Sequence, residues 1–386
     1  RIDESVRRIL QLKFDLGLFE DPFPQDSLAM HVGSEEFADV SRSAAEEAIT
    51  VLRNEDAVLP LSKNARVLVT GPGAASLPAL HGSWSYTWQG TDGAAYPDTP
   101  TIVDALVTRR GINRTAYVPG TTWLQEISIG AAVEEAFRSD VVVIVLGEAP
   151  STEKPGDIDE LDLPDIQLRL VESLAAVGRP IVLVLTENRP RIVRRIVPLV
   201  DAVVLAYEPG PYGAEALAGI LVGDVNPSGR LPFTYPRYSG SIVPYDHKNA
   251  ERYDRNGGLS AFNPQWEFGE GLSYTSFAYS NLKVVSDTLS VDDTLEVSVD
   301  VSNDGSRPGK EVVQVYVRDE YAAITPSVER LRAFDKVRIE PSTTRKVSFS
   351  IPVSDLGFWG VDERYVVEPG KFTVMIGDLT AGFEVE

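Results

Sequence analysis

The sequence predicts an α/β sandwich built on a doubly wound, mostly parallel sheet, followed by an all-β sandwich. Apolar strands alternate with helical stretches between residues 34 and 222, which is the pattern of a parallel sheet covered by helices. From residue 275 the pattern changes, and apolar side chains recur at every second position. A length of 386 residues exceeds one ordinary hydrophobic core, so we expect two domains or slightly more.

The first part begins with an isolated helical pattern. Residues 1–16 carry apolar side chains at helical spacing and end at Gly17, so we expect an amphipathic helix that needs a partner surface. A second helical stripe begins after Ser34 and runs through Val51. Strands are expected at 66–70, 115–118, 141–146, 181–185 and 202–207, with helices between them, notably at 166–176 and 214–222.

The second part alternates apolar and polar residues along 295–301, 313–317, 347–351 and 372–376. With Gly, Asp and Pro between the runs, this pattern predicts an antiparallel sandwich of about seven strands. We therefore expect four segments: a helix and linker at 1–27, the α/β domain at 28–240, a connecting segment at 241–274, and the second domain at 275–386.

Composition excludes several classes of function. A net charge of −21 argues against nucleic acid or an anionic membrane as partner, and it suits neutral ligands such as sugars. The chain has no Cys and only three widely spaced His, so thiol catalysis is excluded and neither a metal site nor a cofactor is expected. No apolar run approaches the roughly 20 residues of a membrane span. Because the chain starts with neither Met nor a signal peptide, we expect it to begin within a longer protein.

An acidic loop follows the most apolar strand. The strand at 141–146 ends at Gly147, and the loop to Asp157 carries Glu148 and Glu153. Ligands of open α/β sheets bind at the carboxyl ends of the strands, where a desolvated carboxyl group can act as a general acid. The residues alone do not separate the two glutamates from each other or from ordinary solvated side chains. The acidic run that starts at Asp157 lacks the Gly and Glu positions of a calcium-binding EF-hand loop.

Two tryptophans occupy a glycine-bounded segment at 82–90, after the first strand. Rigid aromatic rings in a loop suit stacking on sugar rings, and we favour this role over core packing for Trp84. For Trp88 both roles stay open. The nearby Gly71-Pro-Gly73 is no dinucleotide loop, because its third glycine is replaced by Ser76 and the proline removes a phosphate-binding N–H.

Several stretches form an ordered set of motifs along the chain. They are 7–19, 47–54, 59–61, Asp224-Val-Asn-Pro-Ser-Gly-Arg-Leu-Pro232, and Phe268-Gly-Glu-Gly-Leu-Ser-Tyr-Thr275. This set resembles the C-terminal portion of the family 3 glycoside hydrolases, the exo-acting β-glucosidases and β-glucan glucohydrolases. The resemblance covers essentially the whole chain: 7–19 resembles the last helix of that family's N-terminal barrel, 47–54 and 59–61 resemble the entry to its α/β domain, and the second domain is similar to its fibronectin-III-like domain.

The resemblance assigns roles that the residues alone leave open. Family members hydrolyse with retention, using a barrel Asp as nucleophile and a Glu of the α/β domain as acid/base, with the two carboxyl groups about 5–5.5 Å apart. In the plant-type enzymes the acid/base is the second Glu of a loop like this one, which implies Glu153, with Glu148 as a supporting carboxylate. The same subgroup carries a Trp-x-x-x-Trp-Gln-Gly segment, which implies that Trp84 stacks on the +1 sugar with Trp88 beside it. This chain departs from the family pattern at two positions. Glu187-Asn-Arg-Pro190 stands in place of the commoner Asn-Gly-Arg-Pro, and Glu270 stands where Tyr is frequent.

The sequence thus predicts the C-terminal part of a retaining exo-β-glycosidase acting on β-glucosides or β-gluco-oligosaccharides, and inactive without the barrel that carries the nucleophile. A β-xylosidase of the same family and a non-catalytic carbohydrate-binding or assembly module are the alternatives. We expect a β-linked oligosaccharide and the barrel domain or chain as partners, and a secreted or periplasmic location. The sequence leaves open a homodimer.

Overall fold

The computed structural model describes residues 1–96, 98–252 and 262–386. The chain forms two compact units, at 1–41 and 42–386. The first unit contains helix α1 (Ile2–Asp15), a short 3-10 helix (Asp26–His31) and the start of helix α2 (Glu35–Ala48). Helix α1 buries none of its residues, and its apolar side chains, including Val6 and Phe14, are exposed. The predicted amphipathic helix is therefore present, with its apolar side chains exposed.

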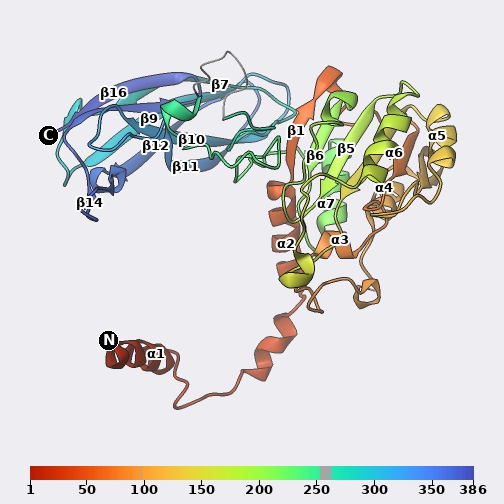
Figure 1. Cartoon of the computed structure of the whole chain (residues 1–386), viewed down its shortest axis with the longest axis horizontal. Helices are drawn as coiled ribbons and strands as arrows, with labels where there is room; N and C mark the ends of the chain where they lie inside the picture. Colours follow the sequence, from red (N-terminus) through yellow and green to blue (C-terminus); the bar gives the residue numbers. More distant parts are fainter. Residues whose placement is uncertain (97, 253–261) are drawn as a thin grey trace. The chain divides into compact units, whose positions relative to one another are not determined.

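The second unit begins with a six-stranded sheet in the order β1-β6-β5-β4-β2-β3 (Figure 1). The pairs from β6 to β3 are parallel, and only the edge strand β1 runs antiparallel, to β6. This confirms the predicted mostly parallel sheet. The strands are β1 (Thr50–Asn54), β2 (Val67–Thr70), β3 (Thr115–Val118), β4 (Val141–Gly147), β5 (Ile181–Thr186) and β6 (Ala202–Leu205).

The sequence interpretation of Val51 was wrong. Helix α2 ends at Ala48, and Val51 lies in β1, where it is almost completely buried. Its spacing from Ala48 fits a helical stripe, but the β-branched residues Ile49, Thr50 and Val51 favour an extended backbone. Pairing with β6 then decides between the two patterns.

Helices cover both faces of this sheet. Alternate strand residues send Val143, Val184 and their neighbours to one face, where α4 (Ile102–Arg110) and α7 (Gly213–Val222) pack. The other face, with Ile144 and Leu183, is covered by α5 (Ile129–Phe137) and α6 (Asp165–Ala175) (Figure 1). Both faces of the strands are thus buried from solvent, which explains their continuous runs of β-branched residues.

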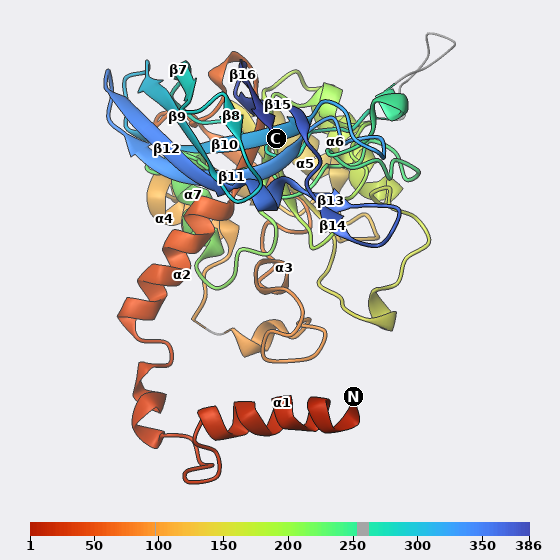
Figure 2. The same ribbon diagram turned by 90° about the vertical axis from the view of Figure 1, so that its left-hand side faces the viewer.

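The second domain is a sandwich of two sheets with a shared apolar core (Figure 2), and its strands pair antiparallel except for β8, which runs parallel to β16. One sheet has the order β11-β10-β15-β16-β8, and the other has β12-β9-β7. Seven of the described strands of this domain are at least seven residues long, and the sequence predicted about seven strands. The bounds are β7 (Phe277–Val284), β8 (Thr288–Leu289), β9 (Thr294–Asn303), β10 (Gly309–Asp319), β11 (Arg330–Ile339), β12 (Thr344–Pro352), β15 (Gly370–Ile376) and β16 (Leu379–Val385).

A separate hairpin, β13 (Phe358–Trp359) and β14 (Tyr365–Val366), stands out from these sheets in both views. The predicted connecting segment at 241–274 includes 253–261, which lie outside the described residues. In the described ranges no helix is long and apolar enough to cross a membrane.

Candidate functional site

Sheet order, rather than chain order, brings the predicted site together. Strand β4 lies between β2 and β5 in the sheet, and all three run parallel. The aromatic segment after β2, the acidic loop after β4 and the segment after β5 therefore leave the same edge of the sheet. This is the edge at which ligands of open α/β sheets bind.

The acidic loop leaves β4 at Gly147, which has a φ of +138°. A Cβ at this glycine would lie 1.9 Å from the carbonyl oxygen of Thr186, so only glycine allows the loop to pass so close to the end of β5. Gln167 of α6 holds both backbone groups of Gly147, accepting from its N–H at 3.1 Å and donating to its carbonyl oxygen at 3.0 Å. The exit of the loop is therefore fixed on two sides.

Glu148 is held in an ion-pair cluster. Its Oε1 accepts from Nε of Arg189 at 3.1 Å, and its Oε2 accepts from Nη1 of Arg191 at 3.2 Å. The Glu148 side chain is only 12% exposed, and Arg191 also donates to the carbonyl oxygen of Asp162. A carboxylate with both oxygens bound to guanidinium groups is held in place. Its geometry fits a brace better than a proton carrier.

Glu153 lies in a different environment, exposed at the tip of the loop. Its backbone has φ +54° and ψ −150°, a region that is almost restricted to glycine, and a single 3-10 turn (Lys154–Gly156) follows it. The indole Nε1 of Trp88 donates a hydrogen bond to Oε1 of Glu153 at 3.2 Å. Backbone strain of this kind clusters at functional sites.

The aromatic segment is attached directly to the acidic loop. Gln89 donates from Nε2 to the carbonyl oxygen of Thr152 at 3.1 Å and accepts from the Thr152 N–H at 3.0 Å. Trp84 is 67% exposed and Trp88 is 47% exposed, so neither indole is part of the core. The backbone N–H of Trp84 bonds to the carbonyl oxygen of Trp88, which closes the turn between them. The structure thus places Trp88, Gln89 and Glu153 together.

Two further carboxyl groups lie at the same strand ends. Burial raises the pKa of Glu187 to about 8, with Tyr235 donating a hydrogen bond to its Oε1 at 2.7 Å. Burial, and then the charge of Glu148, raise the pKa of Glu208 to about 7. The carboxylate of Glu208 lies against Gly82, because a Cβ at that glycine would lie 2.3 Å from Glu208 Oε2. Glu208 therefore packs against Gly82, the first residue of the aromatic segment.

Sequence reasoning missed the roles of Gln89, Arg189, Arg191 and Glu208. Each follows a predicted strand, so the same strand-end rule that singled out the acidic loop also applied to them. The rule does not tell which of several polar residues after a strand turns toward the neighbouring loop. The hydrogen-bond partners of Gln89, Arg189 and Arg191 lie 63, 41 and 43 positions away along the chain and are visible only in the structure.

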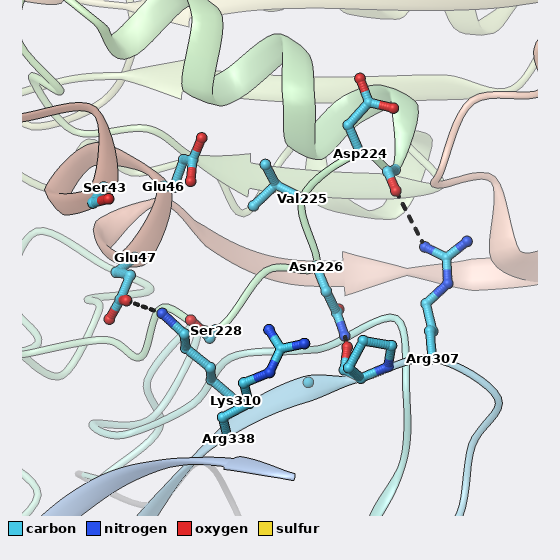
Figure 3. A pocket seen from close by; sticks show the side chains of 13 residues that line it. Ser43, Glu46, Glu47, Asp224, Val225, Asn226, Ser228, Arg307, Lys310 and Arg338 are labelled. Atoms are coloured by element: carbon cyan, nitrogen blue, oxygen red, sulfur yellow. Dashed lines mark hydrogen bonds and ion pairs between the residues drawn. The ribbon is translucent and has the colours of Figure 1, made fainter. Parts of the chain in front are cut away.

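A pocket of about 420 Å³ lies away from this edge, at the junction with the second domain (Figure 3). Contacts between the first and second domains cross it. Glu47 binds Lys310 and also Lys336, the latter at 3.2 Å, and the Nδ2 of Asn226 donates to the carbonyl oxygen of Pro308 at 2.9 Å. These contacts join the two domains. They also give the stretches at 47–54 and 224–232 a structural role.

A comparison with family models decides the classification. Residues 49–274 match the glycosyl hydrolase family 3 C-terminal domain, and residues 311–380 match the fibronectin type III-like domain. The chain belongs to glycoside hydrolase family 3. Among family 3 relatives, a lysosomal β-glucosidase from Dictyostelium discoideum is 40% identical over 100% of this chain and 49% of its own length. A β-xylosidase from Formosa agariphila is 33% identical over 97% of the chain and 53% of its own length.

Solved family 3 structures agree with the fold. The crystal structure of a β-glucosidase from Listeria innocua in complex with isofagomine superimposes with a TM-score of 0.88 and 30% identity. The match covers 99% of this chain and 55% of that one. The chain thus spans about half the length of the relatives it matches.

Proposed function

We propose that this chain supplies the general acid/base of a retaining exo-β-glycosidase, with Glu153 as the proton carrier. The observation that carries the proposal is the hydrogen bond from Trp88 to Glu153, which joins the predicted acidic and aromatic elements at one strand-end edge. Because Trp88 occupies one carboxyl oxygen, the other is left to carry the proton. Trp84 and Trp88 offer exposed rings for the sugar of the +1 subsite.

Glu153 would act twice in the catalytic cycle. As an acid it protonates the glycosidic oxygen while a nucleophilic Asp attacks the anomeric carbon, and as a base it then deprotonates the water that hydrolyses the glycosyl-enzyme. The nucleophile belongs to an N-terminal barrel, the partner that family membership implies. Glu148, clamped by Arg189 and Arg191, supports the loop.

The substrate class is a β-glucoside or short β-gluco-oligosaccharide. This choice rests on the Dictyostelium and Listeria relatives, which are named β-glucosidases. A β-xyloside is the second candidate, because the Formosa relative of similar identity is named a β-xylosidase. Activity on glucosyl and xylosyl versions of one aryl leaving group, measured on the assembled enzyme, decides between the two.

The test of the acid/base role is Glu153→Gln in the enzyme assembled with its barrel. With poor leaving groups we expect kcat/KM to fall by about 10²–10⁴, the usual contribution of general acid catalysis. With dinitrophenyl glycosides, which need no protonation, the loss in glycosylation should be much smaller. Azide, which needs no general base, should restore turnover and yield a β-glycosyl azide.

The matched control is Glu160→Gln, which alters an exposed glutamate of the same acidic run. It should leave both substrates unaffected. Equal losses of Glu153→Gln on good and poor leaving groups would exclude the acid role. No loss at all would transfer the role to Glu148 or favour a non-catalytic carbohydrate-binding module.

A further inference from the structure

The β13–β14 hairpin of the second domain exposes two aromatic rings side by side. Trp359 pairs with Tyr365 across the hairpin, and their ring centroids lie 5.8 Å apart with an interplanar angle of 68°. Trp359 is 67% exposed and Tyr365 is 46% exposed, and neither belongs to the core between the two sheets. Single exposed aromatics are common, but adjoining ones on a projecting hairpin indicate a binding surface.

These rings form one wall of a cavity of about 230 Å³. Its remaining lining includes hydrogen-bonding side chains from β10, β11 and a neighbouring segment: Asp319, Arg330 and Lys248. Apolar faces beside a few convergent polar groups are the general pattern of a small-molecule site. A sugar ring matches this combination, because its C–H face stacks on an indole and its hydroxyl groups pair with charged side chains.

The aromatic wall is fixed before any ligand binds. Arg332 donates to the carbonyl oxygens of Asp355, at 2.7 Å, and Leu356, at 3.2 Å, which secures the chain just before the hairpin. The hydroxyl group of Tyr365 also donates to the Asp355 carbonyl oxygen, at 3.2 Å. A Cβ at Gly357 would lie 2.7 Å from the Tyr365 ring, so the ring packs directly on the backbone. A platform held in this way loses little entropy when it binds.

We infer that this hairpin pocket binds one unit of a neutral β-linked oligosaccharide without cleaving it. The net charge of −21 disfavours polyanionic ligands and is indifferent to neutral ones. The choice of a β-linked sugar rests on the proposed function, but the pocket itself lies on the second domain and uses no residue of the strand-end site. The second domain then holds one unit of the oligosaccharide apart from the strand-end site.

The experiment titrates the full 386-residue chain with laminarihexaose and, separately, cellohexaose by calorimetry. We expect saturable binding of at least one sugar and a loss of about tenfold or more in affinity for Trp359→Ala. Trp359→Phe, which keeps a ring, should retain part of the affinity. Phe334→Ala, which removes an exposed ring of β11 outside this cavity, should change the affinity by less than about twofold.

Three outcomes would overturn the inference. They are the absence of saturable binding, an affinity that Trp359→Ala leaves unchanged or lowers no more than Phe334→Ala does, and a Trp359→Ala variant that changes only the oligomeric state in sedimentation. The last outcome would make the hairpin a contact between copies of the chain. Failure of the Glu153 test leaves these titrations unaffected, so the two proposals fail separately.

Discussion

Gln89 pairs with both backbone groups of Thr152, at 3.1 Å to the carbonyl oxygen and 3.0 Å from the amide nitrogen. The side-chain amide of Gln89 thus makes the two hydrogen bonds to Thr152 that a neighbouring strand would make. The two loops come from neighbouring strands, so the pair joins the aromatic segment to the acidic loop much as a ladder joins strands. The position of Glu153 depends on this pair.

Replacing Gln89 by Ala should release the acidic loop. Each neutral hydrogen bond contributes about 1 kcal/mol net, so losing both should speed amide hydrogen exchange at Thr152 by about tenfold or more. The measurement is residue-resolved exchange on the chain alone. Gln125→Ala, in an exposed loop after β3, is the control and should leave Thr152 unchanged. Unaltered exchange at Thr152 in Gln89→Ala would mean that the pair does not hold the loop in solution.

Replacing Arg191 by Met should destabilise the fold. Glu148 would keep only Arg189, and a carboxylate that is 12% exposed would lose half of its charge compensation. Breaking a buried pair from one side costs about 3 kcal/mol or more of unfolding free energy, measured by urea denaturation. Arg195→Met removes two exposed ion pairs instead, with Asp165 and Glu172, and should change stability by less than about 0.5 kcal/mol. Similar values for the two variants would contradict the bracing role.

The contribution of Glu187 to stability should fall as the pH rises from about 4.5 to about 8, because burial raises the pKa of Glu187 to about 8 from 4.5. Between these values the folded protein binds a proton that the unfolded chain has released, so folding becomes less favourable by at most about 1.4 kcal/mol per pH unit. Glu208, with its pKa raised to about 7, acts in the same direction.

Glu187→Gln isolates the contribution of Glu187. Unfolding free energies of the variant, measured at about pH 5.5 and about pH 8.5, should differ less than those of the parent chain. Glu160→Gln, at an exposed position, should keep the parental difference. If Glu187→Gln shows the parental slope as well, Glu187 is ionised in the folded protein throughout this range.

The strands of the sheet were predictable because burial on both faces leaves a simple trace in the sequence. The run at 141–146 is continuously β-branched or leucine, and it forms the buried strand β4. Strand β1 was not predictable in the same way, because Val51 also fits the spacing of helix α2 and only pairing with β6 resolves the conflict. Local sequence patterns therefore do not predict where one element ends and the next begins.

The candidate site was only partly predictable. A strand-end rule predicted that Glu148 and Glu153 lie at the carboxyl edge of the sheet, where the structure has them after β4, but it treated them alike. What distinguishes them is the set of partners: Arg189 and Arg191 for Glu148, and Trp88 for Glu153. These partners come from other loops, and the sequence carries no local signal for which side chain crosses to which loop. The roles of the glutamates and tryptophans stay predictions until the variants are measured.

Among the described residues, the contacts that hold the acidic loop come from its own domain, and this affects how the two reacting carboxyl groups would be positioned. Gln89 and Asn188 bind the backbone at Thr152 and Ser151, so the loop is ordered when the domain folds. Ordering costs about 1–2 kcal/mol per residue, and a polypeptide that brings the nucleophile need not supply it. The separation of the two reacting carboxyl groups would then be set by how two rigid bodies dock. Substitutions at the interface between the two bodies, far from either carboxyl group, would then change this separation and with it the rate of the reaction.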